Sequence, residues 1–222
     1  MPSLDHFLTT FISSAPLFLK GMWLTVLLTF CSVLLGLVIG LGFALISLSP
    51  FKTLRWLSKI YVNLVRGTPL IVQIFILYFG LSEIIRLSSF VSAMLALAFH
   101  NGAYLSEIFR GAIQSIEKGQ KEAALSLGMT PFMCFRRIIF PQALLRALPA
   151  LANQFIIAIK DSSLAAFISM NELFNIATTQ GANNFDQMTF LLIVAIYYLI
   201  LVLTLTSLTS RLETKLKFSG TT

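Results

Sequence analysis

The stretch EAALSLGMTPFMCFRRIIFP, Glu122–Pro141, interrupts an otherwise strongly apolar chain. It carries one glutamate, two arginines, several small residues and a glycine followed by Met-Thr-Pro. A membrane span tolerates such polarity poorly, and a simple loop needs no such pattern. The stretch therefore predicts a separate structural unit near the middle of the chain.

The composition around this unit indicates an integral membrane protein. Of the 222 residues, 57% are hydrophobic and 11% are charged, and the mean hydropathy is +0.86. An ordinary soluble domain has about 25% charged residues, so little polar surface is available here to cover the apolar core in water. The net charge of +7 is typical of Lys and Arg in cytoplasmic loops, and we expect no nucleic-acid partner.

Five segments have the roughly 20 apolar residues that a membrane-spanning helix needs. We expect an all-α, multi-pass fold in one domain over residues 1–222. Pro69 should make the start of the second span irregular, and the fourth is the weakest because only thirteen uncharged residues separate Arg146 from Lys160. The expected spans are about 22–47, about 57–81, about 88–112, about 141–160 and about 187–210.

Loop charges predict the orientation. Thirteen Lys and Arg residues fall on one side of the five spans and three on the other, the three being Lys20, Arg86 and Lys160. The richer side includes Lys215 and Lys217 in the tail. The N-terminus is therefore expected outside and the C-terminus in the cytoplasm, with the polar insert, about 118–140, also cytoplasmic.

The sequence disfavours two other features, a site built on its cysteines and a cleavable signal peptide. Cys31 lies in an apolar stretch and Cys134 in the insert, so we expect neither a disulfide nor a metal site. The first apolar stretch runs uncharged from Gly21 to Phe51, which is too long for the core of a cleavable signal peptide.

The insert itself predicts two short helices with a bend. Residues 119–127 favour helix, and Gly128 is placed to end it in the left-handed conformation. Thr130 as N-cap and Pro131 at the first position start a second helix, which Pro141 should end as the fourth span begins.

Small residues lie at helical spacing in the first of these helices. Ala123 shares a face with Leu127, and Ala124 shares one with Gly128. Such a face either lets a partner protein approach the backbone closely or packs against the end of the chain's own helix bundle. Periodicity alone leaves both possibilities open.

The spacing Glu122-Ala123-Ala124, three residues, Gly128, nine residues, Ile138, one residue, Phe140-Pro141 resembles the EAA motif of bacterial ABC importer permeases. That motif has Leu where this chain has Phe140. Further stretches resemble the polar amino-acid branch of the family, and the likeness covers about residues 17–213. These stretches are Arg66–Pro69, Gly102–Gly111, Gly119-Gln120, Ser126–Thr130 and Lys160–Leu164.

The resemblance implies an ABC type I importer permease fold in the bacterial inner membrane. Two ABC ATPase subunits, a second permease chain (as homodimer or heterodimer) and an external solute-binding protein would be its partners. The chain would not be an enzyme and would bind no cofactor itself, since ATP and Mg would lie on the ATPase; it contains no P-loop motif. The ATPase-coupling residues would be Glu122, Ala123, Ala124, Leu127, Gly128, Met129 and Thr130.

Polar residues at membrane depth mark either a substrate pathway or contacts between helices. For the amino-acid pathway the candidates are Gln73, His100, Asn101, Tyr104, Asn153 and Asp161. Lys160 and Asp161 also suit an ion pair near the outer interface, and Glu107 and Arg110 suit an i, i+3 pair. A secondary transporter driven by an ion gradient is the alternative function, but it predicts inverted repeats and mid-membrane charges that the sequence lacks.

Overall fold

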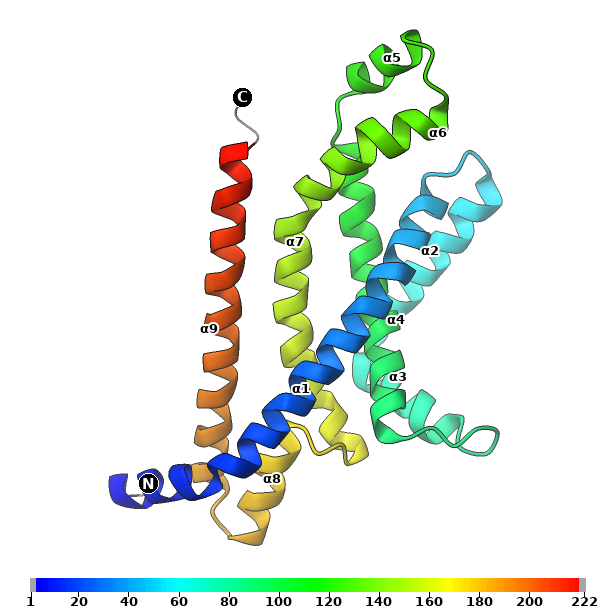
Figure 1. Cartoon of the computed structure of the whole chain (residues 1–222). Coiled ribbons are helices and arrows are strands. Elements are labelled where there is room, and N and C mark those ends of the chain that lie inside the picture. The colour runs from blue at the N-terminus through cyan, green and yellow to red at the C-terminus, as the bar shows by residue number, and fades with distance from the viewer. Residues whose placement is uncertain (1–2, 220–222) are drawn as a thin grey trace.

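The computed structural model describes residues 3–219, with side chains described as far as Arg211, and these residues form helices joined by short turns (Figure 1). The side chains of Lys215 and Lys217 lie outside the described part. The α-helices are α1 Leu4–Ser47, α2 Lys52–Arg66, α3 Leu70–Phe75, α4 Ser89–Gln114, α5 Lys118–Ser126, α6 Pro131–Cys134, α7 Phe140–Asp161, α8 Leu173–Asn183 and α9 Gln187–Ser219. Ile76–Gly80 and Phe135–Ile139 are π-helical, and Ser162–Ile168 is 3₁₀-helical.

Three helical stretches in the described part are long and apolar enough to cross a membrane: Leu4–Ser47, Pro131–Ile168 and Gln187–Arg211. The pair Lys52–Arg66 and Leu70–Gly80 makes a fourth if its 100° bend lies within one broken span. The remaining expected span, α4, does not qualify, since polar residues such as His100 and Asn101 lower its hydropathy. The all-helical membrane architecture is confirmed, and the count of five spans stays a prediction.

The first helix is longer than the sequence predicted. It contains the expected span, about 22–47, and begins earlier, at Leu4, where the Ser3 side chain accepts a hydrogen bond from His6 N. Pro16 lies inside the helix, and a proline bends a helix without necessarily ending it. Figure 1 shows the first turns of α1 lying across the long direction of α7 and α9.

Close packing of α1 on α4 forms the centre of the bundle. A Cβ added at Gly40 would lie 3.0 Å from the Gly102 carbonyl oxygen, and one added at Gly102 would lie 2.7 Å from the Tyr61 hydroxyl. Small residues at such positions let helix backbones approach closely, as is common between membrane helices. The core beside this contact contains Leu28, Ile74 and Leu97, all fully buried.

The insert folds as two helical arms, α5 and α6, at the end of the molecule where α9 finishes (Figure 1). The predicted end of the second arm at Pro141 is wrong: helix continues from α6 into α7. A π-helical turn, in which the Phe140 N–H bonds the Phe135 carbonyl, precedes the proline. This wider turn accommodates the missing N–H of Pro141, so the helix bends instead of breaking.

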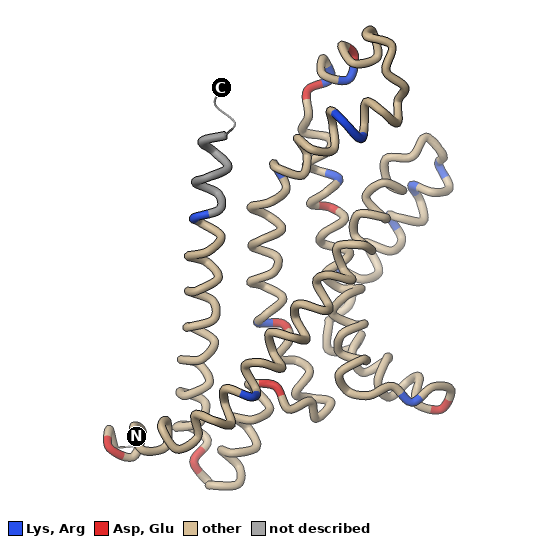
Figure 2. Tube along the Cα trace, viewed as in Figure 1, with Lys and Arg blue, Asp and Glu red and all other residues tan. Residues whose placement is uncertain are grey.

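The start of α1 and the last turns of α9 lie at opposite ends of the bundle, with α8 at the former end and the insert at the latter (Figure 1). In Figure 2 the insert end carries most of the Lys and Arg positions of the described chain, and several Asp and Glu positions lie at the other end. This distribution is the one that loop charges predicted.

Candidate functional site

The insert presents apolar side chains at its tip. Leu127 is 85% exposed and Phe132 is 72% exposed. Both residues flank the turn between the two short helices of the insert. Glu122 and Ala123 are also exposed, so the predicted Ala123–Leu127 face points away from the rest of the chain. Exposed apolar groups at the end of a helix hairpin are typical of a surface that a partner covers.

Gly128 produces the turn between the two arms, as predicted. Its φ is +80°, and a Cβ added there would meet no atom of the chain within 4 Å. The Thr130 side chain accepts a hydrogen bond from Met133 N and Pro131 follows it, which confirms the predicted cap. Gly128 is therefore required by its backbone conformation, and the space around it is open.

Ala124 has the opposite orientation. It is 5% exposed, and α5 packs against the helix that begins at Pro131. Its carbonyl also accepts a hydrogen bond from Met129 N at 3.2 Å. Of the two roles left open for the small residues, Ala124 has the internal one, whereas Ala123 and Leu127 lie on the free surface.

Gln73 lies just after the break between α2 and α3 and stabilises it. Its Nε2 donates to the carbonyl oxygens of Val65, at 2.8 Å, and Thr68, at 3.1 Å. Pro69 provides no N–H and the chain bends by 100° here, so these carbonyls lack their helical partners. The predicted irregularity is confirmed, and the Gln73 amide N–H groups are used in hydrogen bonds to the backbone at this break.

Asn101 is fully buried and joins two helices. Its Nδ2 donates to the Leu97 carbonyl, and its Oδ1 accepts a 2.9 Å bond from Gln154 Nε2 on α7. The interhelical hydrogen bond given as the alternative for Asn101 is therefore present, and its partner is Gln154, which the sequence did not single out. Asn153, the neighbouring candidate, is exposed.

His100 and Tyr104 form a separate cluster on α4. Their rings lie 5.2 Å apart at an angle of 45°, and the Arg66 guanidinium lies 5.0 Å from the Tyr104 ring centre. His100 Nδ1 is buried and finds no hydrogen-bond partner in the described part of the chain. Asp161, half-buried at the end of α7, makes no hydrogen bond or ion pair with this cluster in the described chain, so the six predicted pathway residues do not converge on one point.

Of the two predicted pairs, Lys160 and Asp161 form no ion pair in the described chain, whereas Glu107 and Arg110 do. Arg110 donates to Glu107 through Nε, at 3.1 Å, and through Nη2, at 2.6 Å. The i, i+3 spacing in α4 allows this two-bond contact. Arg110 also reaches Gln114 through Nη1 at 2.8 Å, which leaves the pair tied to its own helix.

The sequence did not single out Glu172, which lies outside the candidate spans and caps α8. It is fully buried, and its carboxylate accepts from Phe174 N, Asn175 N and the Tyr198 hydroxyl at 2.7–2.9 Å. Burial raises its pKa to about 7. Glutamate is not among the usual N-cap residues, so no local signal marked it.

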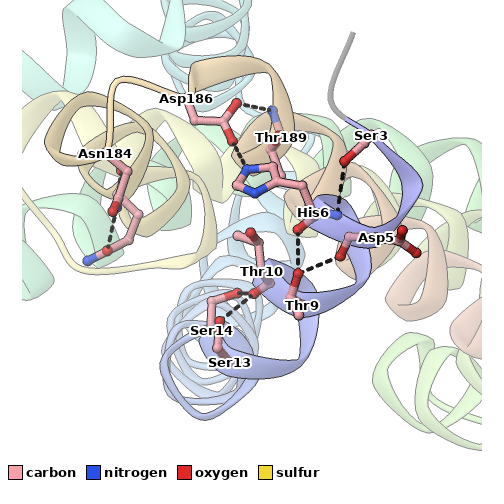
Figure 3. Close-up of polar contacts among 11 residues, drawn as sticks. Ser3, Asp5, His6, Thr9, Thr10, Ser13, Ser14, Asn184, Asp186 and Thr189 are labelled. Atoms are coloured by element: carbon pink, nitrogen blue, oxygen red, sulfur yellow. Dashed lines mark hydrogen bonds and ion pairs between the residues drawn. The ribbon is translucent and has the colours of Figure 1, made fainter.

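Near the same end, the start of α1 is tied to the turn before α9 (Figure 3). His6 Nε2 lies 2.7 Å from Asp186 Oδ2, and the hydrogen bond from His6 holds the pKa of Asp186 below its usual range. A polar hollow of about 420 Å³ lies beside them, with Thr10 and Asn184 in its wall. This surface belongs to the end that the resemblance assigns to a solute-binding protein.

Comparison with known proteins gives consistent matches. Residues 32–218 match the family described as binding-protein-dependent transport system inner membrane component. A probable amino-acid ABC transporter permease protein of Bacillus subtilis (strain 168), YckA, is 44% identical over 188 residues, which cover 84% of this chain and 83% of that protein. The glutamine transport system permease protein GlnP of Escherichia coli (strain K12) is 38% identical over 216 residues, covering 91% and 94%.

A solved structure agrees with them. The chain superposes on an amino acid ABC transporter crystallised with histidines with a TM-score of 0.88 and 36% identity, covering 94% of this chain and 98% of that one.

Proposed function

The chain belongs to the family of binding-protein-dependent transport system inner membrane components, and we propose that it is the permease subunit of an ATP-driven importer for a polar amino acid. One observation carries the coupling part of this proposal. The insert holds Leu127 and Phe132 exposed beside the open turn at Gly128. In a chain without a P-loop, such a surface suits the ATPase subunit that must supply the energy.

We further propose five spans in a bacterial inner membrane, with the N-terminus outside and the insert in the cytoplasm. The concentration of Lys and Arg at the insert end supports this orientation (Figure 2). α4 serves as a span despite its polarity, because its buried amide is satisfied by Gln154 on α7. A membrane helix can carry polar groups when neighbouring helices satisfy them.

The complete transporter would contain two ATPase subunits, a second permease chain and an external solute-binding protein. The family description itself supports the binding protein. ATP and Mg²⁺ would be held by the ATPase subunits. Closure of those subunits would displace the docked insert and shift the equilibrium between inward-facing and outward-facing states.

Within the membrane, His100 and Tyr104 are the stronger candidates for contact with the amino acid. Gln73 and Asn101 already use their amide groups in bonds to backbone and to Gln154. The unpartnered Nδ1 of His100 can supply a hydrogen bond without placing a permanent charge in the membrane. Asn153 and Asp161 stay as secondary candidates for the pathway.

Uptake by reconstituted vesicles tests this function. The chain, its ATPase and its binding protein are placed in vesicles, and uptake of labelled amino acids is measured with ATP, with a non-hydrolysable analogue, and with a proton or sodium gradient alone. We expect uptake only with hydrolysable ATP. Uptake that follows the ion gradient and ignores ATP would instead identify a secondary transporter.

A further inference from the structure

A basic hollow of about 280 Å³ lies between the end of α1, the polar face of α2 and α4. Four cationic side chains line it, and one carboxylate accompanies them: Arg55, Lys59, Arg66, Arg110 and Glu107. None of the residues assigned above to ATPase coupling lines the hollow.

The charges in this hollow are not balanced within the described chain. Glu107 is held by both Arg110 bonds described above, and Arg55, Lys59 and Arg66 form no ion pair with a carboxylate in the described chain, although the Arg66 guanidinium lies over the Tyr104 ring. Arg55 Nη1 donates to the Ser49 and Pro50 carbonyls at 3.0 Å, which satisfies hydrogen bonds but neutralises no charge. Three positive charges therefore surround a space that water or an anion must fill.

The opposite face of α2 is apolar and uncovered. Trp56, Leu57 and Leu64 are 67%, 50% and 62% exposed. In the described chain, the helices that α2 contacts substantially are α1 and α4. The three unbalanced cations lie at i, i+4 and i+11, on one side of the helix. A helix with a basic face, an apolar face and an exposed tryptophan is typical of a membrane–water interface.

We propose that this hollow binds the phosphate group of an anionic lipid from the adjacent leaflet, while the apolar face of α2 contacts neighbouring acyl chains. Basic pockets between membrane helices bind anionic headgroups through charge-assisted hydrogen bonds. The volume is just below the roughly 300–1,000 Å³ of small-molecule pockets, so it holds a headgroup and excludes the chains. A zwitterionic amino acid fits less well, because the only carboxylate present is already paired.

Native mass spectrometry of the full-length chain, purified in detergent, tests the lipid site. The chain is titrated with phosphatidylglycerol or phosphatidylcholine, and the bound fraction gives the affinity. We expect preferential retention of phosphatidylglycerol. Near a membrane surface each cation contributes about 1 kcal/mol, so Lys59→Gln should weaken this binding about fivefold, and Lys59→Gln with Arg66→Gln about 25-fold.

Two controls make the result decisive. Lys52→Gln removes a charge from the same helix outside the hollow and should leave the affinity unchanged, and the charge-conserving pair Lys59→Arg with Arg66→Lys should retain most of it. Equal affinity of the double variant and the unchanged chain would overturn the proposal, as would an equal loss in Lys52→Gln. A parallel titration with amino acids in which the double variant loses binding, while its lipid affinity is unchanged, would assign the hollow to the transported solute instead. No ATP or ATPase is present, so the result is independent of the transport assay.

Discussion

At the insert end, Leu127 and Phe132 are exposed around a glycine with open space beside it, whereas at the opposite end Glu172 is buried with every carboxylate bond accounted for by the chain. The two regions use polar and apolar residues in opposite ways. The insert leaves contacts unmade that a partner protein can make. The α8 region completes its own contacts, since Leu173 N also donates to Thr25 on α1 at 3.2 Å. Docking of a partner protein is therefore expected to depend on the insert surface, and the stability of the fold on the hydrogen bonds around Glu172.

Gly128→Asp should produce the largest effect, because it places a charged side chain in the open space where the ATPase is proposed to dock. We expect loss of ATPase co-purification, corresponding to at least about 2 kcal/mol, the usual threshold for a hot spot. Membrane insertion should be retained. The measurement is pull-down of the ATPase by the tagged permease.

Two variants separate docking from turn geometry. Gly128→Asn tolerates a left-handed backbone, so its failure to bind would point to bulk and not to strain. Gly80→Asp adds the same charge at an exposed glycine at the end of the α3 segment and should bind the ATPase normally. Normal co-purification of the Gly128→Asp chain would refute the docking assignment.

Glu172 should give the chain a pH-dependent stability. Its pKa is about 7 in the folded chain against an ordinary 4.5, so the folded state holds the proton more tightly than the unfolded state. Stability is therefore highest below about pH 4.5 and falls as pH rises toward 7, by about 3 kcal/mol in all. The apparent melting temperature of the purified chain should decrease from pH 5 to pH 7.5.

The substitution Glu172→Gln removes the titrating group and should flatten this pH profile, whatever its constant effect on stability. Glu83→Gln changes an exposed glutamate and should preserve the slope. A slope that persists in Glu172→Gln would show that another group causes it.

Of the three features tested, the hydrogen bond between Asn101 and Gln154 should have the smallest effect. Replacing either residue by leucine leaves the other amide unsatisfied and should cost about 1–3 kcal/mol. The double replacement should cost less than the sum, with a coupling of about 0.6 kcal/mol. Unfolding in a series of denaturing detergent mixtures measures all four forms of this cycle.

Asn153→Leu provides the matched control, since Asn153 is the exposed neighbour of Gln154 and should change stability by less than about 0.5 kcal/mol. Strictly additive costs in the cycle would mean that the two amides do not interact. That result would also return Asn101 to the group of free pathway candidates.

Features set by neighbouring residues were predictable, and features set by distant ones were not. Gly128, Thr130 and the Glu107–Arg110 pair follow from spacing within one helix or turn. The Asn101–Gln154 bond joins residues 53 positions apart, and Glu172 meets Tyr198 on another helix. Periodicity showed that Ala124 and Ala123 lie on different faces, but only tertiary packing shows which face is covered. The error at Pro141 arose because a π-helical turn can absorb a proline that a regular helix cannot.

The unbroken passage from α6 into α7 has a mechanical consequence. Pro131–Ile168 is one helical stretch of 38 residues, with a contour length of roughly 57 Å at the usual rise per residue. The arm from Pro141 to Ile168 is roughly 40 Å long, so a tilt of about 5° at Pro141 would displace its far end by about 3.5 Å. Figure 1 shows this stretch bending between α6 and α7, and the π-helical turn Phe135–Ile139 lies there, which makes it the natural fulcrum. Stiffness at this fulcrum, more than the shape of the insert tip, would then set how much of a partner's motion reaches the far side of the bilayer.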